Sequence, residues 1–374
     1  MIFQIILFGF IFGYAMQIAK LNKFNAFAGA GTLESNTLMK AFLLAVGIGI
    51  FLVMLLVDMQ LADLNIKRLY LLSVLAGALL FGVGLALVGY CPLSLAISVG
   101  QGAIDALFGI AGGLTGGFVA SLIIMPILPY MGPHFTEISL YSIKDDYPWL
   151  FYSVAVVLGL GLIWLAFYAN KKKKSFGPQW IWSGILLAFL SAGSLTYMVM
   201  GRAVGASAAY SWLVSRTTFL QEGIYYQFTQ MQGRWEFYFL IGAFMSGLVI
   251  SLLRGKFKLQ WKHWLWAKFK KEGGYNERMF YAFLGGFFMI LGARVAGGCT
   301  IGHVLAGQMQ LALSSFVFTL TAVFSFLLMS FIFYNTGPEF IMGPIRKPRE
   351  FLKELVRRGK ALRAKATEQE EMTD

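Results

Sequence analysis

The sequence predicts an all-α integral membrane protein with about nine transmembrane helices. Hydrophobic residues make up 58% of the 374 residues and charged residues only 13%. A water-soluble domain of this size could not cover so much apolar surface with polar side chains. The apolar residues also gather in windows of about twenty, the length that crosses the hydrocarbon core of a bilayer. Between these windows lie most of the charges, as expected for loops outside the membrane.

The expected spans cover roughly residues 2–19, 39–57, 69–89, 104–125, 149–169, 179–200, 235–253, 279–297 and 311–334. We expect the first span to be retained as a helix, because it has no basic start and leads into Lys20 and Lys23 rather than a small-residue cleavage site. The two cysteines offer no disulfide framework.

The loop charges predict the orientation of the chain. Basic residues crowd segments 171–174, 254–278 and 346–365, which the positive-inside rule assigns to the cytoplasm. The loop 125–148 carries mainly acidic side chains and falls on the opposite side. The N-terminus is therefore expected outside and the C-terminus in the cytoplasm. Most of the net charge of +13 then lies on cytoplasmic loops, where it can attract acidic membrane lipids.

A Gly-rich element around each cysteine occurs twice. Placing Cys91 on Cys299 also superposes Gly77 on Gly285, and likewise Gly84 on Gly292 and Gly89 on Gly297. With one span between the copies, the second copy starts from the opposite face of the membrane, so the two four-helix repeats are inverted. The expected divisions are a first repeat (1–125), a linker with the central helix (126–175), a second repeat (176–335) and a charged cytoplasmic tail (336–374).

Each cysteine lies where a span ends and a short second segment begins, at 93–99 and 301–306. Pro92 suits the first turn of a new helix, and Gly89, Gly297 and Gly298 suit the breaks. Re-entrant or broken helices of inverted repeats meet near the midplane and form transport sites there. A single buried cysteine is more often a packing residue, but recurrence at the same place in both copies favours a function for the thiols.

Other polar residues near the cysteines allow two interpretations each. Arg294 either recruits anions at the outer mouth or snorkels to the interface. His303 either hydrogen-bonds a carbonyl or takes part in proton transfer or metal binding. Asp105 either caps a helix or relays protons, and Gln101 and Gln308 either contact a ligand or join helices.

Several motifs resemble the YeeE/YedE family of sulfur transport proteins. The similar strings are Gly89-Tyr90-Cys91-Pro92, Asp105-Ala106-Leu107-Phe108, Gly112-Gly113-Leu114 and the stretch from Gly292 to His303, followed by Gly307 and the string from Leu311 to Ser315. The resemblance is specific around both cysteines and extends loosely over most of 1–335. It implies import of thiosulfate or a related sulfur or selenium species across a bacterial inner (plasma) membrane, with cysteines at the constriction.

The chain departs from this family after the first span. Members of the family commonly carry a further cysteine there, whereas this chain reads Asn22-Lys23-Phe24-Asn25. Either two cysteines and an amide, from Asn22 or Asn25, form the path, or the substrate has changed.

Three functions compete at this point. The first is a transporter or channel for a small sulfur anion, which needs neither cofactor nor catalytic residue. The second is a thiol-disulfide or persulfide transfer protein that uses Cys91 and Cys299, and the third is a soft-metal transporter that uses Cys and His. The sequence has no C-x-x-C motif, P-loop or acidic metal cluster within the spans, which favours the first. A cytoplasmic sulfur carrier or sulfurtransferase is the expected protein partner, and no nucleic acid is expected.

Overall fold

The computed structural model describes residues 2–131, 134–135, 138–172, 177–261, 263–269 and 274–334. The expected tail, 336–374, lies outside these residues. The helices are α1 (Ile2–Ile18), α2 (Phe24–Gly31), α3 (Thr37–Asp58), α4 (Leu71–Val88), α5 (Pro92–Gly100), α6 (Ile104–Ile127), α7 (Pro148–Lys172), α8 (Gln179–Gly193), α9 (Ala208–Thr217), α10 (Ile224–Leu253), α11 (Trp264–Phe269), α12 (Tyr275–Val295) and α13 (Leu313–Tyr334). Short 3₁₀ turns η1 (Leu128–Tyr130), η2 (Leu140–Ile143) and η3 (Phe219–Glu222) and the π-helix η4 (Ile301–Gly307) complete the helical elements, and β1 (Leu69–Tyr70) pairs antiparallel with β2 (His134–Phe135).

The described part of the chain confirms an all-α membrane protein. Seven helical stretches within it are long and apolar enough to cross a membrane, one of them the continuous stretch Leu71–Gly100 that joins α4 and α5. The apolar helices α1 and α8 are shorter than a full span. The count of nine spans therefore stays a prediction.

Two helices differ from their expected bounds for a local reason. The expected span 235–253 begins earlier, because α10 already starts at Ile224. Its first turns contain Gln, Met and Arg, which are good helix formers although a hydropathy window excludes them. The expected span 179–200 ends early, because α8 stops at Gly193 and turns follow.

Glycines bring α4 and α12 into close antiparallel contact. A side chain at Gly84 would meet the backbone of Gly285, and one at Gly77 would meet the backbone of Gly292. In the repeat comparison Gly77 corresponds to Gly285, and Gly84 corresponds to Gly292. Replacing each glycine by its counterpart in the other copy therefore turns the Gly84–Gly285 contact into the Gly77–Gly292 contact. In the same way α12 packs on α6 while α13 packs on α4. A two-fold relation between the copies would produce this pattern, and the inverted repeat remains a prediction that it supports.

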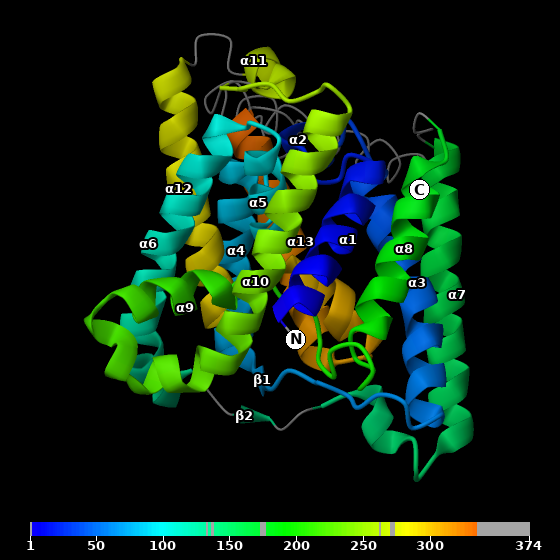
Figure 1. Cartoon of the computed structure of the whole chain (residues 1–374). Coiled ribbons are helices and arrows are strands. Elements are labelled where there is room, and N and C mark those ends of the chain that lie inside the picture. Colours follow the sequence, from blue (N-terminus) through cyan, green and yellow to red (C-terminus); the bar gives the residue numbers. More distant parts are fainter. Residues whose placement is uncertain are drawn as a thin grey trace, which may run out of the picture.

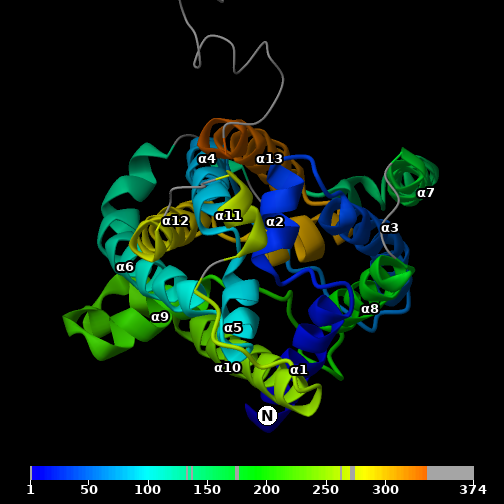
Figure 2. The ribbon, with the colours of Figure 1, turned by 90° about the horizontal axis from the view of Figure 1, so that it is seen from above.

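The short helices lie inside a ring of longer ones. Figure 2 shows α2 and α5 near the centre of the molecule, with α6, α12, α4, α13, α3, α8, α1 and α10 around them. In Figure 1, α2 and α11 lie near the upper end of the bundle, whereas α9 and the β1–β2 pair lie near the lower end. These two ends are called the upper and lower ends below.

The two ends of α7 provide a test of topology. Asp145 precedes this helix and Lys171 lies in its last turn, so α7 separates them by its full length. Cysteines introduced at the two positions, Asp145→Cys and Lys171→Cys, should react with a membrane-impermeant thiol reagent from opposite sides, Lys171→Cys from the cytoplasm. The native cysteines are buried and provide a low background. Reaction of both from the cytoplasm would contradict the orientation and the inverted repeat.

Candidate functional site

Cys91 lies in a break between α4 and α5. The preceding helix ends at Gly89, whose φ of 70° is left-handed and suits glycine. Cys91 then caps α5, and its sulfur accepts a hydrogen bond from the Ser94 amide at 3.4 Å. The Ser94 hydroxyl is 2.6 Å from the Cys91 amide, which completes a reciprocal cap, and Pro92 occupies the first helical position. The expected short segment is therefore confirmed, and the thiol is held at a helix N-terminus.

Cys299 lies in the corresponding break after α12. This helix ends at Val295, and Gly297 has a φ of 80°. The Cys299 carbonyl accepts a hydrogen bond from the His303 amide at 2.8 Å as the chain enters the π-helix η4. Single-turn π-helices occur frequently at functional sites. Both predicted breaks thus have a left-handed glycine two residues before the cysteine.

The two cysteines lie within electrostatic range of one another although they are far apart in the sequence. Both are free thiols, with 0% of Cys91 and 1% of Cys299 exposed. They lie close enough to interact electrostatically with one another, and the Tyr210 side chain interacts with both. The Tyr210 hydroxyl donates to the carbonyl of Pro92 at 3.0 Å. The fold therefore brings the two breaks together inside the bundle.

Arg294 is buried close to Cys299 rather than extended into solvent. Only 8% of the residue is exposed, and its Nε donates to the Tyr225 hydroxyl at 2.7 Å. Its guanidinium interacts electrostatically with Cys299, and its Nη1 has no hydrogen-bond partner among the described residues. A buried cationic donor without a partner is costly, and an anion would satisfy it.

Two further cations, Lys67 and Arg202, lie near Arg294 and were not found from the sequence. The Nζ of Lys67 donates to the Gly297 carbonyl at 2.6 Å, and Lys67 interacts electrostatically with Cys299, Arg294 and Arg202. The guanidinium of Arg202 lies 5.0 Å from the centre of the Trp235 ring. Because each comes from a loop far from Cys299 in the chain, no local pattern indicated them.

Glu236 is the acidic member of this group. It is 1% exposed, accepts a hydrogen bond from the Ala208 amide at 2.6 Å, and interacts electrostatically with all three cations. We call Lys67, Arg202, Arg294 and Glu236 the basic cluster. Three basic side chains against one acidic side chain give this cluster a formal net charge of +2 beside Cys299, which favours an anion.

His303 makes the structural hydrogen bond predicted for it. Its Nε2 is 3.1 Å from the Ala296 carbonyl and must donate to it, because a carbonyl oxygen only accepts. Its Nδ1 is 3.0 Å from the Ser315 hydroxyl, and the ring stacks on Phe318 with 4.4 Å between centres. Among the described residues no group of three His, Cys, Asp or Glu side chains could hold a metal ion.

The predicted amides have different positions. Asn22 is 1% exposed and donates to Gln101 at 3.0 Å and to the Ser98 hydroxyl at 3.2 Å, which ties the turn after α1 to α5. Its Oδ1 has no partner among the described residues. Asn25 accepts a hydrogen bond from the amide of Leu265 at 3.3 Å and so anchors α11.

In the second copy Gln310, rather than the predicted Gln308, is the fully buried amide. Gln310 is 0% exposed, donates to the Ala306 carbonyl at 2.9 Å and accepts a hydrogen bond from the Asn65 amide at 2.6 Å. Gln308 is half-buried at the end of η4. The sequence analysis named only Gln308 as the counterpart of Gln101, although Gln308 and Gln310 each lie one residue from the equivalent position.

Asp105 is the centre of a buried network near the upper end, and not simply a helix cap. It accepts hydrogen bonds from Arg278 at 2.6 and 3.0 Å, and His263 Nε2 lies 3.0 Å from it. The Tyr90 hydroxyl is 2.8 Å from the same nitrogen of His263. The sequence assigned Arg278 to the cytoplasmic charges, but its side chain is fully buried and also donates to the carbonyls of Leu87 and Val88.

Phe24 fills the space between this network and the first break. Its ring stacks on His263 with 5.0 Å between centres, and the Arg278 guanidinium lies 4.4 Å from its centre. A side chain at Gly89 would collide with Phe24. The upper side of the Cys91 break is thus covered by an aromatic ring and a satisfied ion pair, in contrast to the unpaired donors beside Cys299.

The helix breaks and buried polar groups at the centre of an apolar bundle define this molecule as a polytopic membrane transport protein. The sulphur transport family matches the chain over residues 24–328. The protein therefore belongs to this family of sulfur transport proteins, YeeE/YedE. It is also similar to the thiosulfate transporter TsuA of Spirochaeta thermophila, with 27% identity over 333 residues that cover 85% of this chain and 94% of the relative.

The Asp105–Arg278 pair should be essential for stability. We expect Asp105→Asn to destabilise the protein by about 3–5 kcal/mol, because it leaves the buried guanidinium of Arg278 without its counter-charge. Thermal unfolding of the purified protein in detergent measures the effect. The control is Asp58→Asn, which removes the partly exposed partner of Lys144 and should cost about 0–1 kcal/mol. Equal effects of the two substitutions would contradict a structural role for the network.

Proposed function

We propose that this protein imports a small sulfur-containing anion, thiosulfate above all, along a path past the basic cluster, Cys299 and Cys91. The observation that carries the proposal is the meeting of two buried thiols, each at a helix break, beside an arginine with an unpaired donor. The relative from Spirochaeta thermophila is named as a thiosulfate transporter, which supports this choice of substrate.

The basic cluster serves as the entry site in this proposal. Thiosulfate is a dianion, and an unpaired ion in hydrocarbon would cost tens of kcal/mol. The net charge of +2 at the cluster matches such an ion. Arg294 Nη1 is available to its oxygen atoms, and so is the Thr300 hydroxyl, which is buried without a partner among the described residues. Glu236 limits the positive charge, so that the anion is attracted without being trapped.

The thiols serve the sulfur end of the substrate. A thiol is a weak donor, and the terminal sulfur of thiosulfate is a soft acceptor, so contacts with Cys299 and then Cys91 hold the ion only weakly. A permeation path needs such weak successive sites. The N-terminus of α5 at Cys91 adds the positive end of a helix dipole.

The amides complete the path where the family cysteine is missing. Asn22 is bonded to Ser98 of α5, the half-helix that begins after Cys91, and its Oδ1 is unpaired. Asn25 faces α11 instead. Within this proposal Asn22 is the amide on the substrate side of the turn and Asn25 is a structural residue. The contacts of Asn22 at the C-terminal end of α5 support a path in which an amide follows the two thiols.

The proposal includes an orientation. The lower end, with the basic cluster, faces the outside of a bacterial inner membrane, and the upper end, with α2 and α11, faces the cytoplasm. The loop charges support this assignment. A cytoplasmic sulfur carrier or sulfurtransferase would then receive the cargo.

The entry site predicts a defect that depends on concentration. Arg294→Gln removes the buried cation, and we expect the KM for uptake of labelled thiosulfate into vesicles that contain only this protein to rise at least tenfold. This loss corresponds to one charge-assisted hydrogen bond of about 1.5 kcal/mol or more. The control Arg254→Gln removes an exposed cation at the end of α10 and should leave the KM unchanged. An unchanged KM in Arg294→Gln would show that the arginine is structural.

The thiols predict a loss of transport with the fold preserved. Cys91→Ala and Cys299→Ala should each reduce uptake at least tenfold, because each removes a donor on the path. Thermal stability should change little in Cys299→Ala, whereas Cys91→Ala also loses the cap of α5 and should cost about 1 kcal/mol. Parental uptake in both would identify the cysteines as packing residues and refute the path.

Serine substitutions distinguish non-covalent passage of the ion from covalent sulfur transfer through the thiols. A hydroxyl keeps a donor of similar size but lacks nucleophilic sulfur, so partial uptake by Cys91→Ser or Cys299→Ser supports non-covalent passage. Complete loss in both would favour covalent sulfur transfer between the thiols. Comparison of thiosulfate, sulfite, selenite and sulfate as substrates in the same vesicles defines the selectivity.

A further inference from the structure

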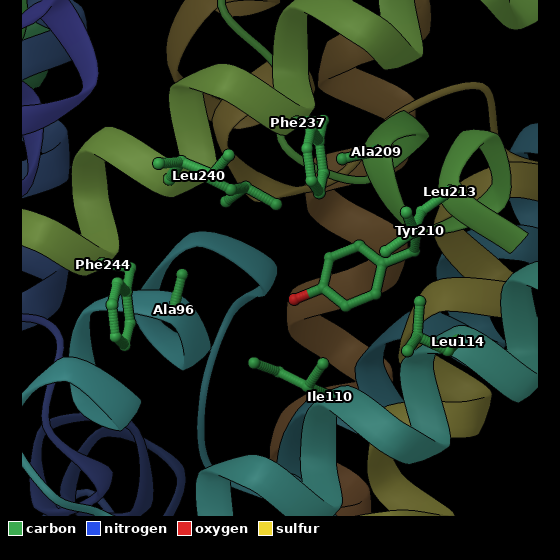
Figure 3. A pocket seen from close by; sticks show the side chains of 10 residues that line it. Ala96, Ile110, Leu114, Ala209, Tyr210, Leu213, Phe237, Leu240 and Phe244 are labelled. Carbon is green, nitrogen blue, oxygen red and sulfur yellow. The ribbon is translucent and has the colours of Figure 1, made fainter. Parts of the chain in front are cut away.

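A cavity of about 210 Å³ opens between α5, α6, α9 and α10, away from the basic cluster and the network around Asp105. Figure 3 shows apolar side chains around it, with the Tyr210 ring reaching in from α9. Ala96 and Tyr210 are buried, whereas Ile110 and Leu114 on α6 and Leu240 on α10 are half-exposed. The cavity therefore has a closed floor against the half-helix α5 and a mouth on the outer side of the bundle.

The mouth opens at the depth of the hydrocarbon core. Leu240 lies near the middle of α10, and Ile110 and Leu114 lie within α6; both helices are long and apolar enough to cross the membrane. Figure 2 shows α6, α9 and α10 on one side of the perimeter, with α5 behind them. In a bilayer the space outside this mouth is filled by acyl chains.

The lining gives a polar ligand nothing to bind. The lining side chains are apolar apart from one hydroxyl, that of Tyr210, which already donates to the Pro92 carbonyl. The sulfur anion would therefore find no donor here, and water would find no set of polar partners. The volume of about 210 Å³ is large enough for several methylene groups in a row. A run of methylene groups of this length corresponds to the terminal part of a fatty-acyl chain, which lies near the bilayer centre.

We propose that this cavity binds one acyl chain of a membrane phospholipid. The bound chain covers Ala96 of α5 and the ring of Tyr210, and Tyr210 is tied to Pro92, the residue after Cys91. The lipid thus supports the wall of the cysteine site from behind. This link to transport rests on the proposed function, whereas the binding itself does not.

Photolabelling tests the binding. The full-length protein is reconstituted into vesicles of phosphatidylglycerol and phosphatidylcholine that carries a diazirine near the acyl terminus, and labelled peptides are mapped by mass spectrometry. We expect labelling of lining residues on α6 and α10. Leu114→Trp fills the cavity and should reduce that labelling at least fivefold, and Leu240→Trp, from the opposite wall, should do the same. The control is Leu107→Trp on the same helix as Leu114, which is 47% exposed and does not line the cavity.

Equal labelling in the filled variants and the control would overturn the proposal. So would cross-links through Leu114 or Leu240 to a second copy of the chain, because they would make the cavity a protein contact. If Leu114→Trp or Leu240→Trp fails to fold, its unfolding curve shows this. The labelling of the other variant then tests the proposal. Uptake is measured in the same vesicles: specific lipid labelling without uptake of any sulfur anion would refute the proposed function and still support the lipid site.

Discussion

The rest of the structure depends on one constraint: the backbone carbonyl and amide groups at two helix breaks inside the bundle must find hydrogen-bond partners. At membrane depth an exposed carbonyl or amide has no water to bond, so each break must be covered by other parts of the protein. Arg278 donates to the last carbonyls of α4, and Ser94 bonds the amide of Cys91. At the second break Lys67 donates to Gly297, and His303 donates to Ala296. One nearby side chain and one from a distant element thus complete each helix end.

The two breaks are covered with different electrostatic consequences. At the upper end the cation that caps α4 is neutralised, because Asp105 pairs with Arg278 and the Phe24 ring fills the remaining space. Beside Cys299 the cations outnumber the single carboxylate, and Arg294 retains an unpaired donor. A common architectural need therefore produces a sealed side and an anion-attracting side. This asymmetry gives direction to a site that the repeated sequence alone would make symmetric.

Close glycine packing makes room for this arrangement. Glycines of α4 and α12 allow the two helix backbones to touch along an antiparallel contact. The same compactness leaves little space inside the bundle, and the cavity beside α5 is lined on its inner side by the residues that support the Cys91 segment. In our two proposals the acyl chain and the sulfur anion lie on opposite sides of Tyr210.

The sequence by itself determined the membrane class, the positions of both breaks and the two cysteines, because hydropathy, glycine and proline act locally and the duplication is visible in the chain. It also named Arg294, His303, Gln101 and Asn22, all of which make buried or partly buried polar contacts in the fold. Tertiary structure alone decided which charges are buried. Arg278 was read as a loop charge and Lys67 was overlooked, since their partners lie far away in the sequence.

The burial of Gln310 was also decided by tertiary structure, because its side chain accepts a hydrogen bond from the amide of the distant Asn65. The same is true of Asp105: as the first acidic residue of a helix it suits a cap, and only the fold brings Tyr90, His263 and Arg278 to its carboxylate. Local sequence signals determine where a helix starts, ends or breaks. Which polar groups satisfy the buried charges and carbonyls depends on neighbours that only the folded chain brings together.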